Sequence, residues 1–174
     1  PKPPQGDSEL LTVTVRAATA DDAPLLMRGI KGIAALLGEL DEVACSEDDL
    51  RRFGFGDRPA FEAKIAEAEG QCAGMCLFFP IFSTYFGRPG VFVQDLFVEE
   101  AFRSAGIGET LLRQVARHSH KRGGVYMRLA VAEGNERAQA FYRRLGLDWS
   151  REERSFIAHG KPFASLASLP EAGN

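Results

Sequence analysis

The chain has 174 residues and a formal net charge of −3, and 45% of its residues are apolar while 26% are charged. This length suffices for one domain with its own core, and the apolar fraction argues against global disorder. The slightly acidic composition argues against nucleic-acid binding, and no run approaches the ~20 apolar residues of a membrane span.

The charges divide along the sequence. Residues 1–102 carry nine basic and 17 acidic side chains, whereas residues 103–154 carry eleven basic and six acidic ones. Chance is one interpretation of this division. The other is a protein that handles a cation with its first part and an anion with its second.

The three cysteines, Cys45, Cys72 and Cys76, are an odd number without metal-type spacing. We interpret them as structural thiols and expect no metal site. No signal peptide opens the sequence, so we expect a cytoplasmic protein without a membrane or nucleic-acid partner.

The first sixty residues predict one strand and two helices. Pro-rich residues 1–10 are expected to form a flexible leader, followed by one domain over 11–168 and a tail over 169–174. Alternating Thr and Val predict a strand over 11–17, and Thr19 is a candidate N-cap for an amphipathic helix over 20–37. Ser46 with Asp49 predicts the start of a second helix.

An acidic segment lies between these two helices. It includes Glu39 and Asp41 and contains no basic residue. These two acids are candidates to bind a cationic substrate. The alternative is a solvated loop whose acids cap the helices, and both interpretations stay open.

The middle of the chain predicts an antiparallel meander with arms near 61–66, 73–82 and 91–98, the last nearly all apolar, as expected of a central strand. A helix from 107, a strand over 125–131, a helix from Asn135 to Gly146, and final strands at 147–149 and 155–166 follow. The predicted class is α/β (α+β), a single domain whose mixed, mostly antiparallel sheet has about seven strands and flanking helices.

A glycine-rich loop, RSAGIG at 103–108, separates the third arm from the following helix. Glycine allows the backbone to approach a ligand, and a helix N-terminus presents unpaired N–H groups, so the loop could cradle pyrophosphate. The alternative is a plain turn before a helix. The pattern is neither a Walker loop nor the dinucleotide fingerprint.

Three segments in order carry a family resemblance: VFVQDLFVEE, the glycine loop, and AEGNERAQAFYRRLGL. Together they resemble the acetyl-CoA core of the GNAT superfamily of N-acetyltransferases. SEDDLRRFGFGDRPAFEAKIAE, FSTYFGRPG and QDLFV further resemble the spermidine/spermine (diamine) branch. The resemblance implies a GNAT fold, acetyl-CoA as co-substrate bound in a splay between the third and fourth strands after the first helix, and a homodimer.

The resemblance also assigns roles to residues. It places the CoA pyrophosphate on the loop backbone, formed by Arg103, Ser104, Ala105, Gly106, Ile107 and Gly108. It pairs the pantetheine arm with the backbone of Leu96, Phe97 and Val98. Asn135 is expected to contact the cofactor, to act as a helix N-cap, or both. Tyr142 matches the family's phenol that protonates the departing thiolate, with a half-buried core aromatic as the alternative.

Two positions depart from the diamine branch. The family's Glu-Asp pair is Gln94 and Asp95 here, and an amide cannot accept a proton. Asp95, another carboxylate or bulk water must then accept it, unless the acceptor amine already has a low pKa. The segment before the loop aromatics lacks the family's acid, so Tyr85 and Phe86 are the substrate-binding candidates there, through cation–π contact.

The predicted function is direct transfer of an acetyl group from acetyl-CoA to a primary amine of a small substrate, a diamine or polyamine being one option. One alternative is a CoA-binding sensor or interaction module without catalysis, motivated by Gln94. Another is a protein N-terminal acetyltransferase, against which the bulky loop at 82–90 argues. The sequence does not name the amine.

Overall fold

The computed structural model describes residues 12–150 and 155–168. The chain divides into two compact units, residues 1–132 and residues 133–174, and each is described by itself. The predicted leader over 1–10 and tail over 169–174 lie outside the described residues.

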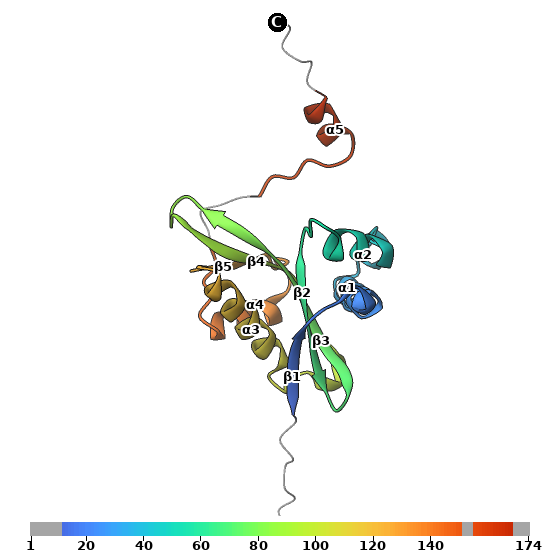
Figure 1. The fold of residues 1–174 in the computed structure, drawn as a ribbon, viewed down its shortest axis with the longest axis vertical. Helices are drawn as coiled ribbons and strands as arrows, with labels where there is room; N and C mark the ends of the chain where they lie inside the picture. The colour runs from blue at the N-terminus through green and yellow to red at the C-terminus, as the bar shows by residue number, and fades with distance from the viewer. Residues whose placement is uncertain (1–11, 151–154, 169–174) are drawn as a thin grey trace, which may run out of the picture. The chain divides into compact units, whose positions relative to one another are not determined.

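The first unit is built on a five-stranded sheet in the order β1-β2-β3-β4-β5 (Figure 1). The strands are β1 (Val13–Ala17), β2 (Glu62–Ala68), β3 (Gln71–Ser83), β4 (Arg88–Val98) and β5 (Met127–Leu129). The first three pairings are antiparallel and the β4–β5 pairing is parallel. The predicted mixed, mostly antiparallel sheet is thus confirmed.

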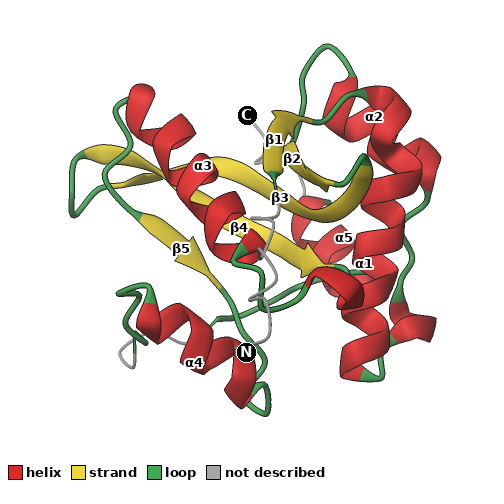
Figure 2. Ribbon diagram, turned by 90° about the horizontal axis from the view of Figure 1, so that it is seen from below, coloured by secondary structure: helices red, strands yellow, loops and turns green. Residues whose placement is uncertain are grey.

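Helices cover both faces of this sheet. The helices α1 (Ala23–Leu37) and α2 (Glu47–Phe55) lie on one side, and α3 (Ile107–Lys121) lies on the other (Figures 1 and 2). On the α1/α2 side, Leu26 and Leu50 join Leu77 in a core whose members are buried. On the α3 side, Ile107, Leu111 and Val115 are almost fully buried. Burying such apolar side chains stabilises the fold by roughly 1.5–3 kcal/mol each.

Both predicted N-caps of the first unit are confirmed. Thr19 precedes a short 3₁₀ turn, Ala20–Asp22, that leads into α1, and it shares a capping box with Asp22. At α2, the Asp49 N–H donates to Ser46 Oγ at 3.1 Å, and the Ser46 N–H donates to the Asp49 carboxylate at 2.9 Å. Ser46 thus satisfies an N–H group that the start of α2 leaves unpaired, whereas at Thr19 the N–H and the hydroxyl both donate to the Asp22 carboxylate.

The second unit contains α4 (Glu136–Arg144) and α5 (Lys161–Ala167). Asn135 caps α4, because its Oδ1 accepts the Ala138 N–H at 3.1 Å. Gly146 has a φ of 86° and donates to the Arg143 carbonyl, while Leu147 donates to the Tyr142 carbonyl. This pair of bonds is a Schellman motif, so the predicted helix end at Gly146 is confirmed.

The predicted strands beyond Gly146 are wrong for the described residues. The backbone there is irregular at 147–150 and 155–160, and α5 follows. Pro162 explains part of this result, because proline suits the first turn of a helix and cannot donate to a strand ladder. β5 is also shorter than expected. The described residues hold five strands rather than about seven. None of the helices in this part of the chain has the length and apolar character of a membrane span.

Candidate active site

The connection from β4 to α3 turns at two residues with positive φ. Ser104 has a φ of 69° and Gly106 a φ of 76°, and α3 begins at the next residue, Ile107. Within the described residues the N–H groups of Gly106, Ile107 and Gly108 donate to no backbone carbonyl. These N–H groups lie where the sequence predicts an anion cradle, and N–H groups at a helix start suit an anion of the size and charge of a pyrophosphate.

Arg103 also forms a contact with β4 that the sequence does not indicate. Its Nε donates to the carbonyl of Val98 at 3.2 Å, so the side chain folds back onto the last residue of β4. This contact fixes the start of the glycine loop to the strand. No sequence signal separates such a clamp from a cation that only faces solvent.

The second half of β4 has a free edge. β5 pairs with β4 only at Val91–Val93, so among the described residues no strand lies beside residues 94–98 on that side. The carbonyl of Phe97 faces β3, since it would lie 2.6 Å from a Cβ built on Gly74. Carbonyls alternate along a strand, so those of Leu96 and Val98 face the free edge. The pairing between the third and fourth strands after α1 thus ends at Val93, where the sequence analysis expects these strands to splay.

A β-bulge interrupts β4 at the predicted catalytic pair. The pairing with β3 passes from Asp95 opposite Leu77 to Val93 opposite Phe78, which leaves Gln94 as the extra residue. Gln94 is exposed, whereas Asp95 is half-buried. Bulges bend a strand and redirect side chains, and here the bulge lies where the splay begins.

Asp95 is held in an environment that disfavours its charge. Burial raises the pKa of its carboxyl group above the usual value, and the described residues offer it no hydrogen bond or ion pair. A carboxylate of this kind binds a proton more readily than one in water. Asp95 thus has the chemistry of a proton acceptor next to the free edge of β4.

The acids of residues 38–49, which include the first turn of α2, divide into two groups. Glu47 and Asp48 form ion pairs with Arg51 at 3.0 and 2.9 Å, and Asp49 caps α2. Glu39 and Asp41 are exposed and form no ion pair within the described part of the chain. The helix-capping interpretation therefore holds for half of the segment, and Glu39 and Asp41 stay candidates for binding a cation.

The structure does not bring Tyr85 and Phe86 to the other candidates within one chain. They lie in the turn between β3 and β4, where Tyr85 is 98% exposed and Phe86 packs on Tyr126 with ring centroids 5.1 Å apart. The turn precedes Arg88, and about 20 Å of strand separates Arg88 from Gln94. Their substrate-binding role stays a prediction.

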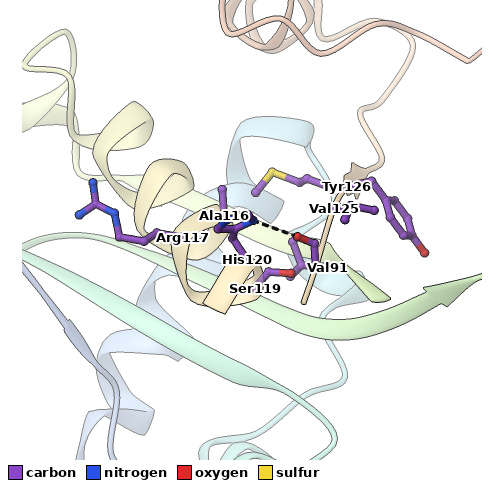
Figure 3. Close-up of a pocket in the computed structure, with 9 residues that line it drawn as sticks. Val91, Ala116, Arg117, Ser119, His120, Val125 and Tyr126 are labelled. Carbon is purple, nitrogen blue, oxygen red and sulfur yellow. Dashed lines mark hydrogen bonds between the residues drawn. The ribbon is translucent and has the colours of Figure 1, made fainter. Parts of the chain in front are cut away.

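A cavity of about 500 Å³ lies near this same end of β4 (Figure 3). It is formed by the end of α3 and the start of β5, with Val91, Ser119, His120 and Tyr126 among its walls. The Arg117 guanidinium points away from the other labelled residues in Figure 3, and His120 Nδ1 lies 3.4 Å from the Gly124 carbonyl. None of the sequence-predicted site residues lines this cavity, whose walls from α3 belong to the last turns of that helix rather than to its start at the glycine loop.

The remaining two candidates belong to the second unit. Asn135 is the N-cap of α4, as one of its two interpretations predicts. Tyr142 lies seven residues later, which places it on the same face of the helix, and its half-buried ring contacts Phe141 at a centroid distance of 5.1 Å. Their roles toward the cofactor stay predictions.

Comparison with known proteins agrees with this geometry. Residues 32–147 match the model of the Acetyltransferase (GNAT) family. A thialysine N-ε-acetyltransferase of Sus scrofa is 32% identical over 91% of this chain and 99% of the relative. A spermidine/spermine N(1)-acetyltransferase-like protein of Homo sapiens is 30% identical over 80% of this chain and 21% of the relative. The solved structure of aminoglycoside N-acetyltransferase AAC(6')-Iy in complex with CoA has a TM-score of 0.67 at 18% identity, covering 87% of this chain and 96% of that one.

Proposed function

Because the chain belongs to the GNAT family of acetyl-CoA-dependent N-acetyltransferases, we propose that it acetylates a primary amine of a small cationic acceptor by direct transfer. The names of the relatives put thialysine and spermidine among the first acceptors to test. The observation that carries the proposal is the free edge of β4, which runs from Asp95 to the N–H cradle of the glycine loop.

The residues at this edge fit acetyl-CoA, which supplies the activated acetyl thioester. The N–H groups at the start of α3 suit the pyrophosphate, and the carbonyl of Leu96 faces the splay where the amide groups of the pantetheine arm would pair. The carbonyl of Val98 already accepts a hydrogen bond from Arg103 Nε. The other guanidinium nitrogens of Arg103 form no hydrogen bond among the described residues, so they can donate to phosphate.

The acceptor must lose a proton before it can attack. A primary amine has a pKa of about 10.4, so about one molecule in a thousand is neutral near pH 7.4, which corresponds to a deficit of about 4 kcal/mol. We assign proton removal to Asp95, whose half-buried carboxylate lacks a competing partner among the described residues. Gln94 has the exposed position from which an amide could orient the amine or a water molecule.

We assign the second proton transfer to Tyr142. Its phenol (pKa about 10) is matched closely enough to a thiol (about 8.5) to protonate the leaving thiolate. Because the amine attacks the thioester carbonyl directly, the carbon–nitrogen bond forms as the carbon–sulfur bond breaks, and no acetylated enzyme accumulates.

Turnover tests the proposal. Acetyl-CoA is incubated with thialysine, spermidine, L-ornithine, a monoamine and an aminoglycoside, and both free thiol and N-acetyl product are measured. We expect turnover on at least one amine, and Tyr142→Phe and Asp95→Asn to lower kcat by about ten- to a hundredfold each. No product from any amine would refute the enzyme as proposed, and undiminished turnover by Tyr142→Phe would refute the role of that residue.

A CoA-binding sensor remains the second candidate, because Gln94 replaces an acid at the bulge. Calorimetry that finds tight binding of acetyl-CoA without transfer to any amine would favour the sensor. We also propose a homodimer, as the diamine branch implies, which light scattering at several protein concentrations would test.

A further inference from the structure

Glu99, the first residue after β4, connects three parts of the first unit. Its N–H donates to the carbonyl of Ala73 in β3 at 2.9 Å. Its own carbonyl accepts the N–H of Phe102 at 2.9 Å, which closes the 3₁₀ turn η3 (Glu100–Phe102) that leads to the glycine loop. Its carboxylate forms an ion pair with Arg28 Nε of α1 at 2.7 Å. A strand, a turn and a helix therefore all contact this one residue.

The side chain of Glu99 points toward α1 because of the strand that precedes it. Alternate residues of a strand point to opposite faces, so Glu99 continues the face of Phe97. Phe97 belongs to the core under α1, and a Cβ built on Gly32 of that helix would overlap its ring. The close approach of α1 to the end of β4 thus depends on a glycine. Arg28 lies four residues before Gly32, on the same side of the helix, and from there its guanidinium reaches Glu99.

Beyond Glu99, hydrogen-bonded turns continue to the glycine loop. The Arg103 N–H donates to the Glu100 carbonyl at 3.2 Å, and the Ala105 N–H donates to the Phe102 carbonyl at 3.4 Å. The far end of this connection is fixed as well, because the apolar face of α3 is buried in the core. The conformation of the glycine loop is therefore held between α3 at one end and Glu99 at the other.

The ion pair of Arg28 and Glu99 is of a kind that contributes little to global stability. The Arg28 side chain is 53% exposed and that of Glu99 is 28% exposed. Pairs with this much solvent contact add little to the free energy of unfolding. What the pair does is geometric, because it ties the exit of β4 to α1 and selects one position for the backbone that begins the loop.

We propose that Arg28 is a positioning residue for the cofactor half of the site, which acts through Glu99 to hold the glycine loop in the conformation that presents its N–H groups to the pyrophosphate of CoA. The inference rests on the proposed function for the identity of this ligand. Arg28 itself does not contact the cofactor in this arrangement. Its loss therefore weakens the binding of CoA and leaves the amine and the proton transfers unaffected.

The first test needs neither cofactor nor turnover. Arg28→Gln should accelerate amide hydrogen exchange at Phe102 and Ala105 by about three- to tenfold, because the turns open more easily once Glu99 is released from α1. Amides in the middle of α3 should be unchanged. Arg51→Gln, which removes comparably exposed ion pairs from α2, is the control and should leave exchange in the turns unchanged. Unchanged exchange in Arg28→Gln would overturn the proposal whether or not the protein binds CoA.

The second test measures the Kd of CoA by calorimetry. Arg28→Gln and Glu99→Gln should each raise this Kd about three- to tenfold, and the double variant should raise it no further, because the two side chains act as one unit. Arg28→Lys keeps the charge and should restore the Kd to within about twofold. The melting temperatures of all these variants should stay within about 2 °C of the unmodified protein. If Arg28 instead bound a phosphate directly, Glu99→Gln would release it and lower the Kd, and that result would overturn the proposal.

The kinetic constants give a third readout, which a general loss of structure would not imitate. In Arg28→Gln the KM for acetyl-CoA should rise by the same factor as the Kd of CoA, while kcat and the KM for the amine stay within about twofold. A lower kcat with an unchanged KM for acetyl-CoA would overturn the positioning role. Absence of CoA binding by the unmodified protein would refute the proposed function and the ligand named here, whereas the exchange experiment would still decide whether Arg28 holds the loop.

Discussion

Asp95, the proposed proton acceptor, carries an energetic cost for the fold. Its carboxyl has a raised pKa because burial disfavours the charge, and no described side chain compensates. A group whose pKa is raised in the folded state destabilises that state once it ionises, and the cost is absent where it stays protonated. A residue of this kind is unfavourable for the fold and useful for accepting a proton.

Asp95→Asn should therefore raise stability while it lowers activity. We expect the Asp95→Asn variant to have a higher melting temperature at pH 7.5 than the protein with Asp95, because the variant lacks the buried ionised carboxyl group. The difference should shrink as the pH falls below about 4, where the carboxyl is protonated in both states. Differential scanning calorimetry across this range measures it. A variant less stable at pH 7.5 would mean that Asp95 has a stabilising partner.

The glycine loop allows a matched pair of substitutions at positive φ. Gly106→Ala introduces a Cβ at a φ of 76°, which costs roughly 1–2 kcal/mol, although no neighbour lies within 4 Å of that Cβ. We expect the KM for acetyl-CoA to rise about five- to thirtyfold as the cradle distorts. Ser104→Gly relieves the same kind of strain at a φ of 69° and should raise stability by about 0.5–1 kcal/mol. Equal KM values for both variants would contradict a role of the loop conformation.

At the scale of elements, an ion pair joins β1 to the start of α1. Both terminal nitrogens of Arg16 donate to the carboxylate of the buried Asp22, at 2.7 and 2.8 Å, and its Nε donates to Glu67 of β2 at 2.8 Å. The Thr19 N–H adds a further bond to Asp22 at 2.8 Å. Hydrogen bonds from Arg16 outweigh burial and lower the pKa of Asp22 from 3.8 to about 2.

This pair gives stability a defined pH dependence. Because the pKa of Asp22 is lowered on folding, its contribution is complete above about pH 4 and is lost as the pH falls toward 2. Asp22→Asn should cost about 2 kcal/mol at pH 7, measured by urea unfolding, and much less at pH 2.5. Asp21→Asn, an exposed neighbour in the same turn, is the control and should cost little at either pH.

The ends of the helices can be predicted from the sequence where they depend on a capping residue. The caps at Thr19, Ser46, Asn135 and Gly146 lie where the side chains or glycine predict them. The bulge at Gln94 is not predictable, because it depends on how β3 and β4 align over their whole length. The positive φ of Ser104 is hidden for a similar reason, since serine is not typical of that region. The last two predicted strands failed because apolar residues alone do not separate a short strand from a short helix.

For the molecule as a whole, the change from acidic to basic composition along the sequence coincides with the glycine loop between β4 and α3. The basic half begins with Arg103, which both clamps β4 and borders the N–H cradle. Two of its basic side chains are already paired, since Arg113 contacts Glu109 and Arg122 contacts Glu62 at 2.6 Å. The field that remains for the phosphates of CoA in the proposed site is therefore smaller than the eleven basic residues suggest, and we expect the loop backbone to provide much of the binding.

Salt separates these two contributions. Long-range attraction between charges is screened over about 10 Å at 0.1 M salt, whereas short-range hydrogen bonds from the N–H groups of the helix start are less affected. If the loop backbone dominates, raising sodium chloride from 20 to 300 mM should increase the KM for acetyl-CoA by no more than about threefold.

The exposed Glu39 and Asp41 should make the KM of a dicationic acceptor more sensitive to salt. Over the same range of sodium chloride this KM should rise about three- to tenfold, while the KM of a monoamine changes less. Steady-state kinetics at constant pH measure the KM values of acetyl-CoA, the dicationic acceptor and the monoamine at each salt concentration. Glu39→Gln combined with Asp41→Asn should abolish the difference between the dicationic acceptor and the monoamine, and a difference that survives in this variant would place the cation on other acids.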